Sequence, residues 1–120
     1  MRPNLWSSLP AMPYDAELAE RIRAHFGRRA DVEEKKMFGG VGFMLAGNMC
    51  VGVWKDALIV RVGAAAYAEG LTHDHAREFD VTGRPMRGWL MVDPEGIEAD
   101  ADLKRWIGRA VKFVETLPAK

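Results

Sequence analysis

Three short apolar runs, separated by pairs of turn-forming residues, constrain the fold of this chain more than any other sequence feature. The pair Gly47-Asn48 separates residues 43–46 from residues 49–53, and Lys55-Asp56 separates the second run from residues 58–62. A Gly-Asn pair between two apolar runs is typical of a β-hairpin with a two-residue loop, here of type II′. We therefore predict three consecutive antiparallel strands.

The two loops also predict which side chains share a face of the sheet, because directly opposite residues point to the same side. With these loops, Met44 faces Val51 and Val53 faces Leu58. One face is then wholly apolar and is the predicted core face: Met44, Ala46, Met49, Val51, Val53, Leu58, Val60 and Val62. The opposite face is mixed, yet too apolar for a surface that meets only water. It comprises Phe43, Leu45, Cys50, Gly52, Trp54, Ile59 and Arg61.

Two amphipathic helices are predicted, one on each side of this strand region. The first covers residues 14–26, where apolar residues recur every four positions and Asp15 is placed to cap the amino end. The second begins at Asp100 or Asp102 and carries apolar residues at alternating spacings of three and four. Each helix therefore has one apolar face to bury.

The remaining segments complete the predicted fold. Residues 64–70 are rich in alanine and predict a short helix, while residues 79–81 and 88–92 predict further strands. Strands in a meander flanked by helices are typical of the α+β class. We predict a two-layer sandwich, with helices packed on one face of an antiparallel or mixed sheet.

Composition limits the classes of protein to which the chain can belong. A length of 120 residues suits one domain, which we expect over residues 13–120 after a flexible extension at residues 1–12. The 17 basic and 17 acidic residues cancel, which excludes a nucleic-acid binder that works by bulk charge. A single cysteine, Cys50, excludes an internal disulfide and favours a cytoplasmic protein. No apolar run approaches 18 residues, so no membrane association is expected.

None of the motifs that resemble catalytic or cofactor sites is complete. The glycines of residues 39–42 lead into a strand and lack the Gly-Lys-Ser/Thr of a phosphate loop. His73 and His75 lack a second cluster of ligands, so we interpret them as part of a solvated loop. Cys50 has no neighbouring base and is expected to pack as a small apolar side chain. We predict no catalytic residues, no metal and no cofactor, although the sequence leaves enzymatic activity open.

Two groups of residues are candidate binding sites. Exposed apolar side chains on the mixed face would suit a protein partner or a second copy of the chain. Basic side chains flanking the strands would instead suit a small molecule or an anion, if they converge on a pocket. The first group is Phe43, Leu45, Trp54 and Ile59, and the second is Lys36, Arg61, Arg84 and Arg87.

Five motifs in order resemble the amino-terminal domain of the TfoX/Sxy competence-regulator family. Together they extend the resemblance over nearly the whole chain, from about Tyr14 to Leu117. The motifs are Glu34–Gly40, Gly47–Cys50, Val60–Gly63, Thr82–Trp89 and Asp93–Gly96.

The resemblance implies a two-layer α+β fold and a bacterial origin. Full-length regulators of this family carry a second, helical carboxy-terminal domain, and we expect this chain to be a stand-alone form of the first domain. The family implies a link to competence or transcription but supplies no catalytic residues. We therefore predict a non-enzymatic interaction or regulatory module that forms a homodimer or binds a protein through the mixed face. The alternative is a small-molecule or anion-binding protein, with an enzyme included, that uses the basic group; a nucleic-acid partner is disfavoured.

Overall fold

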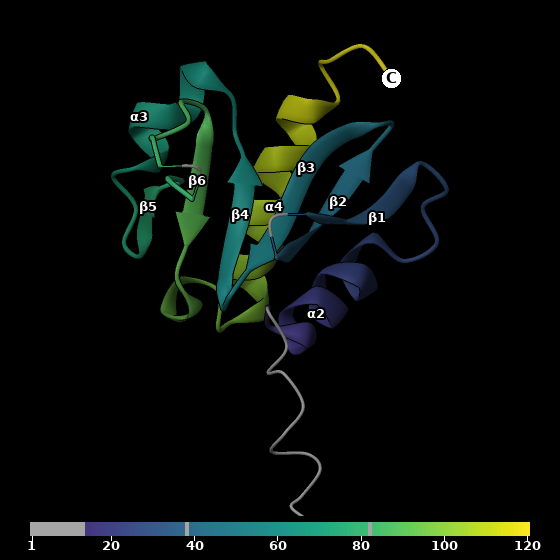
Figure 1. Ribbon diagram of the computed structural model, residues 1–120, viewed down its shortest axis with the longest axis horizontal. Coiled ribbons are helices and arrows are strands. Elements are labelled where there is room, and N and C mark those ends of the chain that lie inside the picture. The colour runs from purple at the N-terminus through teal and green to yellow at the C-terminus, as the bar shows by residue number, and fades with distance from the viewer. Residues whose placement is uncertain (1–13, 38, 82) are drawn as a thin grey trace, which may run out of the picture.

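One six-stranded antiparallel sheet, covered on one face by two helices, forms the structure (Figure 1). The computed structural model describes residues 14–37, 39–81 and 83–120, so the expected extension at residues 1–12 lies outside the described residues. The strand order is β1-β2-β3-β4-β6-β5. The elements are α2 (Ala16–Phe26), β1 (Val32–Met37), β2 (Gly40–Leu45), β3 (Asn48–Trp54), β4 (Ala57–Arg61), η1 (Ala64–Ala66), α3 (Tyr67–Gly70), β5 (Ala76–Glu78), β6 (Trp89–Val92), η2 (Pro94–Gly96) and α4 (Asp100–Val114).

Helix α2 confirms the first predicted helix and its cap. The Asp15 carboxylate accepts hydrogen bonds from the backbone N–H groups of Glu17 and Leu18, at 2.9 and 3.1 Å. These two donors have no partner within the helix, so the cap stabilises the first turn. Gly27 ends the helix with a φ of 59°, a conformation that glycine adopts without strain.

Helix α4 packs its apolar side against β3 and β4 (Figure 1). It begins at Asp100, as predicted, with Asp100 and Asp102 in the first turn. Its buried residues follow the predicted spacing: Leu103, Trp106, Ile107, Ala110 and Val114. The short helix predicted at residues 64–70 is present as η1 and α3. Among the described residues, no helix has the length and apolar character needed to cross a bilayer.

The sheet contains one strand more at its edge than the sequence indicated. Strand β1 carries four consecutive charged residues, Glu33 to Lys36, and only its two ends are half-buried. It lacks the alternating pattern of a half-buried strand because it lies at the sheet edge, where charges discourage further pairing. The strand expected at residues 79–81 is displaced to residues 76–78, whereas β6 lies where it was predicted. The predicted α+β class, with helices on one face, is confirmed.

The first hairpin has a different loop from the predicted one. Leu45 pairs with Asn48, so the loop is Ala46-Gly47 rather than Gly47-Asn48. Ala46 and Gly47 have φ values of 51° and 85°, which make the turn type I′ rather than type II′. Further along, Phe43 pairs with Val51 and Met44 with Met49, which leaves Cys50 as the extra residue of a β-bulge.

This register reverses the predicted facing of several side chains, because a shift of one residue turns a strand over. Phe43, Leu45 and Cys50 lie in the core beneath the helices, so their predicted place on the mixed face is wrong. Met49, predicted for the core, packs instead with the residues of the opposite face, and Met44 lies beside it. We call the face that α2 and α4 leave uncovered the outer face.

The second hairpin confirms its predicted register. Val53 pairs with Leu58 and Val51 with Val60 around the Lys55-Asp56 loop. These four residues are buried in the core between the sheet and the helices. Trp54, Ile59 and Arg61 therefore lie on the outer face, as the sequence indicated.

Candidate functional site

A second apolar cluster lies on the outer face. After β5 the chain returns across β4 and β6 through residues 79–81 and 83–88, which we call the return segment. Phe79 of this segment is buried against Ala57, Ile59 and Met91 of the sheet. Backbone hydrogen bonds from Met86 N to Phe79 O and from Trp89 N to Met86 O, both 3.0 Å, hold the segment in place. It partly covers a sheet face that would otherwise meet water.

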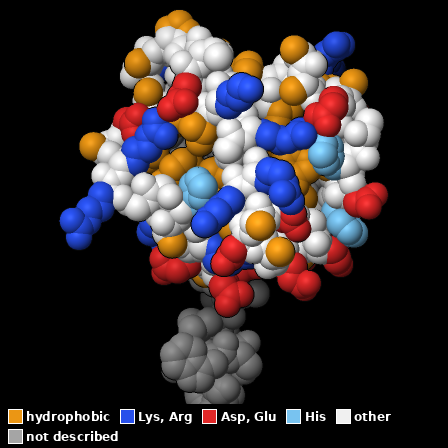
Figure 2. Space-filling view, turned by 180° about the vertical axis from the view of Figure 1, so that it is seen from behind, with side chains coloured by type: hydrophobic (Ala, Val, Ile, Leu, Met, Phe, Trp, Pro, Cys, Tyr) orange, Lys and Arg blue, Asp and Glu red, His pale blue; other side chains and the backbone are white. Residues whose placement is uncertain are grey.

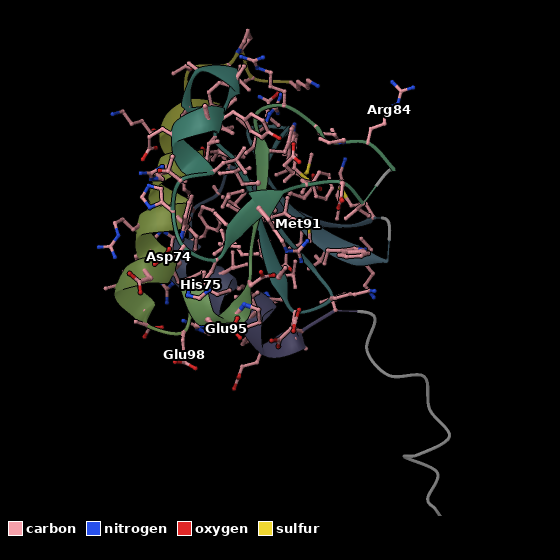
Figure 3. The ribbon with its side chains drawn as sticks, turned by 90° about the vertical axis from the view of Figure 1, so that its left-hand side faces the viewer. Asp74, His75, Arg84, Met91, Glu95 and Glu98 are labelled. Carbon is pink, nitrogen blue, oxygen red and sulfur yellow. The ribbon has the colours of Figure 1, made fainter. Side chains whose placement is uncertain are left out.

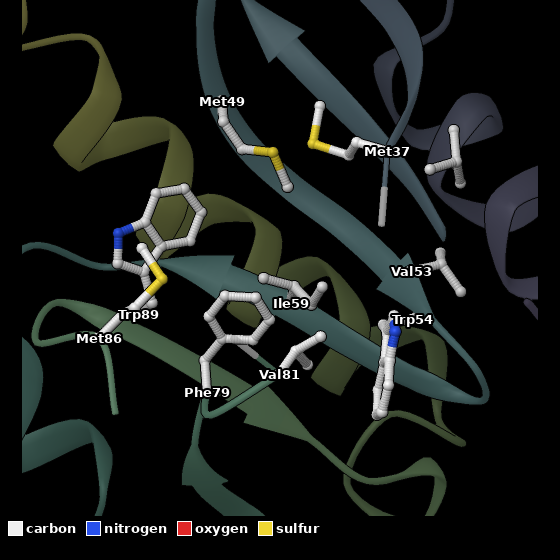
Figure 4. Close-up of a pocket in the computed structure, with 10 residues that line it drawn as sticks. Met37, Met49, Val53, Trp54, Ile59, Phe79, Val81, Met86 and Trp89 are labelled. Carbon is white, nitrogen blue, oxygen red and sulfur yellow. The ribbon is translucent and has the colours of Figure 1, made fainter. Parts of the chain in front are cut away.

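An apolar pocket of about 270 Å³ opens between the return segment and the outer face. Met37 and Met49 lie on one side, Phe79, Met86 and Trp89 lie on the other, and Ile59 lies between them (Figure 4). We call this the outer-face pocket. It is lined by Met37, Val41, Met49, Val53, Trp54, Ile59, Phe79, Val81, Met86 and Trp89, none of which has a titratable side chain.

Two paired glycines lie beneath two methionine side chains of the pocket. Gly42 of β2 lies opposite Gly52 of β3. A Cβ atom on Gly42 would lie 2.8 Å from Sδ of Met49 and 3.0 Å from Cε of Met37, and one on Gly52 would lie 2.9 Å from Cε of Met49. Glycine at both positions therefore allows the flexible methionine side chains to lie flat against the sheet.

A cation lies over each of the two tryptophans of the pocket. Nζ of Lys55 is 4.6 Å from the ring centroid of Trp54, and Cζ of Arg61 is 5.1 Å from that of Trp89. Arg61 also lies 5.7 Å from the ring of Phe113 and donates a long, 3.4 Å hydrogen bond to the carbonyl oxygen of Met49. These ring contacts hold each cation beside a tryptophan that lines the pocket, with Arg61 lying between Trp89 and Phe113 of α4.

The structure distributes the predicted apolar site residues over three environments. Trp54 lines the outer-face pocket and is half-buried. Ile59 lines the same pocket but is only 6 % exposed, because the return segment covers it. Phe43 and Leu45 lie in the core, so the expectation that they are exposed to a partner is wrong.

The predicted basic group does not form one cluster. Lys36 pairs with Val41 and shares the helix side of the sheet, whereas Arg61 pairs with Trp89 at an outer-face position. Three strand spacings, or about 14 Å, separate the two strands that carry them. Arg84 projects away from the body of the domain (Figure 3). Arg87 lies near Tyr67. Burial and then Glu78 raise the pKa of the Tyr67 phenol, and the charge of Arg87 partly opposes them.

A polar cluster lies on the far side of the sheet, where side chains of both charges are interspersed (Figure 2). Arg109 binds both carboxylate oxygens of Glu69, at 2.8 and 3.3 Å, and Nε2 of His73 lies 2.7 Å from Oε2 of Glu69. The bonds from Arg109, and then from His73, lower the pKa of the Glu69 carboxyl to about 2. Arg109 and His73 also contact the ring of Trp106. This ion-pair cluster is exposed and joins α3 to α4.

Two further motifs from the sequence, the histidines of residues 73–75 and Cys50, can be placed in the structure. Asp74, His75 and Glu95 lie at the side of the domain away from Arg84 (Figure 3), and the described residues contain no group of three side chains able to hold a metal ion. Burial raises the pKa of the Cys50 thiol to about 12, which keeps it protonated and unreactive. Cys50 thus packs as an apolar side chain, as predicted.

Sequence reasoning identified only two of the pocket residues as candidates, Trp54 and Ile59. The chain has seven methionines, and methionine is common at adaptable binding surfaces. That count was the one signal in the sequence for Met37, Met49 and Met86. Phe79 and Val81 carry a weaker signal, because their two-residue spacing suggested a strand. The return of this segment over the sheet is a tertiary feature that no local pattern indicates.

The fold and the pocket define a small two-layer α+β domain with an apolar site on the open face of its sheet. A family model described as the TfoX N-terminal domain matches residues 24–114. The chain therefore belongs to the TfoX N-terminal domain family, which confirms the resemblance noted in the sequence. Searches of curated proteins and of solved structures found no match.

Proposed function

We propose that this domain is a non-enzymatic interaction module whose outer-face pocket receives one large apolar side chain of a partner protein. The observation that carries the proposal is the pocket itself, because all ten of its lining side chains are free of titratable groups. Chemistry on a substrate generally needs an acid, a base or a nucleophile at the site. An apolar anchor needs none of these.

The size and composition of the pocket support an anchor residue. Its volume of about 270 Å³ lies just below the range of about 300–1,000 Å³ that is usual for pockets holding drug-sized ligands. Protein interfaces gain most of their affinity from a few aromatic or apolar side chains that enter such pockets. Tryptophan and methionine, which line this pocket, are both enriched at interfaces. A regulatory role in competence or transcription is compatible with such a module and rests on the family alone.

A matched pair of variants tests the proposal. Met49 lines the pocket, while Met44 lies directly opposite it on the same face and outside the pocket lining. Met49→Lys places a cation in the pocket, and Met44→Lys makes the same change beside it. Circular dichroism and thermal melting establish that both variants remain folded.

The assay is selection from a displayed library of random peptides with the immobilised domain as bait. We expect the selected peptides to share a large apolar residue, to bind wild type and Met44→Lys alike, and to bind Met49→Lys at least about tenfold more weakly. Peptides that bind all three proteins equally, or a selection that never rises above background, would refute the proposal.

A second copy of the chain is one protein that could supply the anchor. Light scattering after size-exclusion chromatography measures this directly. A dimer of wild type and Met44→Lys that becomes a monomer with Met49→Lys would identify the partner as the chain itself. The same mass for all three proteins would exclude the pocket from self-association and leave a different protein as the occupant.

A further inference from the structure

We propose that the partner segment is extended and carries an acidic residue on each side of its apolar anchor, with Lys55 and Arg61 binding the two carboxylates. The inference rests on the proposed function and names the chemistry of the partner. It follows from where the two cations lie relative to the pocket and from the spacing between them.

The two cations mark opposite ends of the pocket. Lys55 lies over Trp54 in the β3–β4 turn, and Arg61 lies over Trp89 at the last residue of β4. Figure 4 shows Trp54 and Trp89 on opposite sides of the pocket, with Ile59 between them. An apolar side chain that enters over Ile59 therefore has a tryptophan on each side, and each of these tryptophans carries a cation over its ring.

The spacing matches that of an extended peptide. Strand β4 advances four residues from Ala57, beside the turn, to Arg61, a distance of about 14 Å at the rise of an antiparallel strand. An extended partner covers the same distance in about four residues. Positions i, i+2 and i+4 of an extended chain point to one side, so an acidic–x–apolar–x–acidic segment presents all three side chains to this face.

Both cations are available for such a partner. The ion pairs formed between described residues include neither Lys55 nor Arg61, although Asp56 and Asp80 lie close in sequence to pocket residues. The tryptophan rings hold both cations in position, which reduces the entropy that each loses when a carboxylate binds. Glu33 shares the outer face but lies opposite Met44, outside the pocket lining.

The experiment is an NMR titration with three synthetic peptides. The acidic peptide is acetyl-Glu-Ala-Phe-Ala-Glu-amide, the neutral peptide replaces both Glu with Gln, and the third replaces Phe with Ala. The readouts are the indole N–H signals of Trp54 and Trp89. The signal of Trp106, which lies in the helix-side core, is the internal reference.

We expect the acidic peptide to shift the signals of Trp54 and Trp89 while that of Trp106 stays in place. The neutral peptide should bind at the same site about fivefold more weakly, because it loses two exposed ion pairs, each of which contributes roughly a twofold gain in affinity. The Ala peptide should not shift either signal. The preference for the acidic peptide should decline as salt is added, because both cations are near the surface.

Variants with matched charge assign the effect to a residue. Lys55→Gln removes the cation at an exposed turn, and Lys36→Gln removes one on the opposite side of the sheet. We expect Lys55→Gln to reduce the preference for the acidic peptide and Lys36→Gln to leave it unchanged. The test uses Lys55 because Arg61 packs against two rings, so its replacement could also disturb the fold.

The outcomes separate this inference from the function on which it rests. Equal affinities for the acidic and neutral peptides, with shifts at Trp54 and Trp89, would overturn the acidic flanks and leave the apolar anchor in place. An acidic preference that Lys55→Gln and Lys36→Gln reduce equally would also overturn it. If the Ala peptide binds as well as the Phe peptide, or if no peptide shifts these signals, both proposals fail.

Discussion

Replacement of Phe43 and of its neighbour Met44 by alanine tests the register of the first hairpin, on which the position of the pocket depends. Phe43 is 1 % exposed and stacks on Phe26 of α2, with ring centroids 6.1 Å apart. Met44 is half-buried on the outer face. A register in which Met44 faces Val51 would exchange these two environments, so the two substitutions should have very different costs.

The magnitudes follow from burial. A buried Phe→Ala change costs about 3–5 kcal/mol, because the apolar contacts are lost and the cavity collapses only partly. The stacking with Phe26 places Phe43→Ala in the upper part of this range. Met44→Ala removes a half-exposed side chain and should cost about 1 kcal/mol or less. The expected difference in the free energy of unfolding is therefore about 3 kcal/mol.

Urea unfolding followed by circular dichroism measures both free energies. Domains of this size lose roughly 4 °C of Tm per kcal/mol, so thermal melting should show the same order. Phe43→Leu is a milder substitution at the same position and keeps the comparison possible if Phe43→Ala is too unstable to purify. A larger cost for Met44→Ala than for either Phe43 variant would refute the register and, with it, the position of Met49 in the pocket.

Three further predictions test other parts of the structure. Ile59→Lys should lower the free energy of unfolding, measured in urea, by about 3 kcal/mol or more. The return segment buries this side chain, and a lysine there has no partner. A fully stable variant would mean that Ile59 is exposed. Cys50 should react with a thiol reagent at pH 8 only as fast as the domain unfolds, since burial raises its pKa to about 12, and rapid labelling of the native protein would contradict this. The folded-state pKa of Glu69 is lowered from 4.5 to about 2, so its contribution to stability is present above pH 4.5 and is lost as the pH falls toward 2. Glu69→Gln should therefore flatten the decline in Tm between these pH values, and a decline identical to that of wild type would exclude the ion pair with Arg109.

Much of the fold could be predicted because its signals are local. The cap at Asp15 and the stop at Gly27 lie within a few residues of the helix that they bound. The apolar spacing of α4 repeats over 15 residues, long enough to be unambiguous. The register of the second hairpin followed from one pair of turn residues, Lys55 and Asp56, because an apolar run lies on each side of this pair.

The first hairpin departs from its local pattern because distant residues determine the turn. The side chain of Asn48 is buried and donates a 2.9 Å hydrogen bond to the carbonyl oxygen of Pro118. The backbone N–H of Lys120 donates to the carbonyl oxygen of Ala46, at 2.8 Å. These contacts draw Asn48 out of the loop, and the bulge at Cys50 then places Phe43 in the core. Neither contact is visible within a window of neighbouring residues.

The candidate site shows the same division between local and distant information. Amino-acid order alone places Trp54, Ile59 and Arg61 on one face of the sheet, because the two-residue period of a strand is a local property. The pocket exists only because Phe79 and Met86 return over that face from beyond β5. Cavities depend on contacts between segments far apart in sequence. The local pattern therefore determined which side chains share the outer face, and tertiary packing determined that this face holds a pocket rather than an open surface.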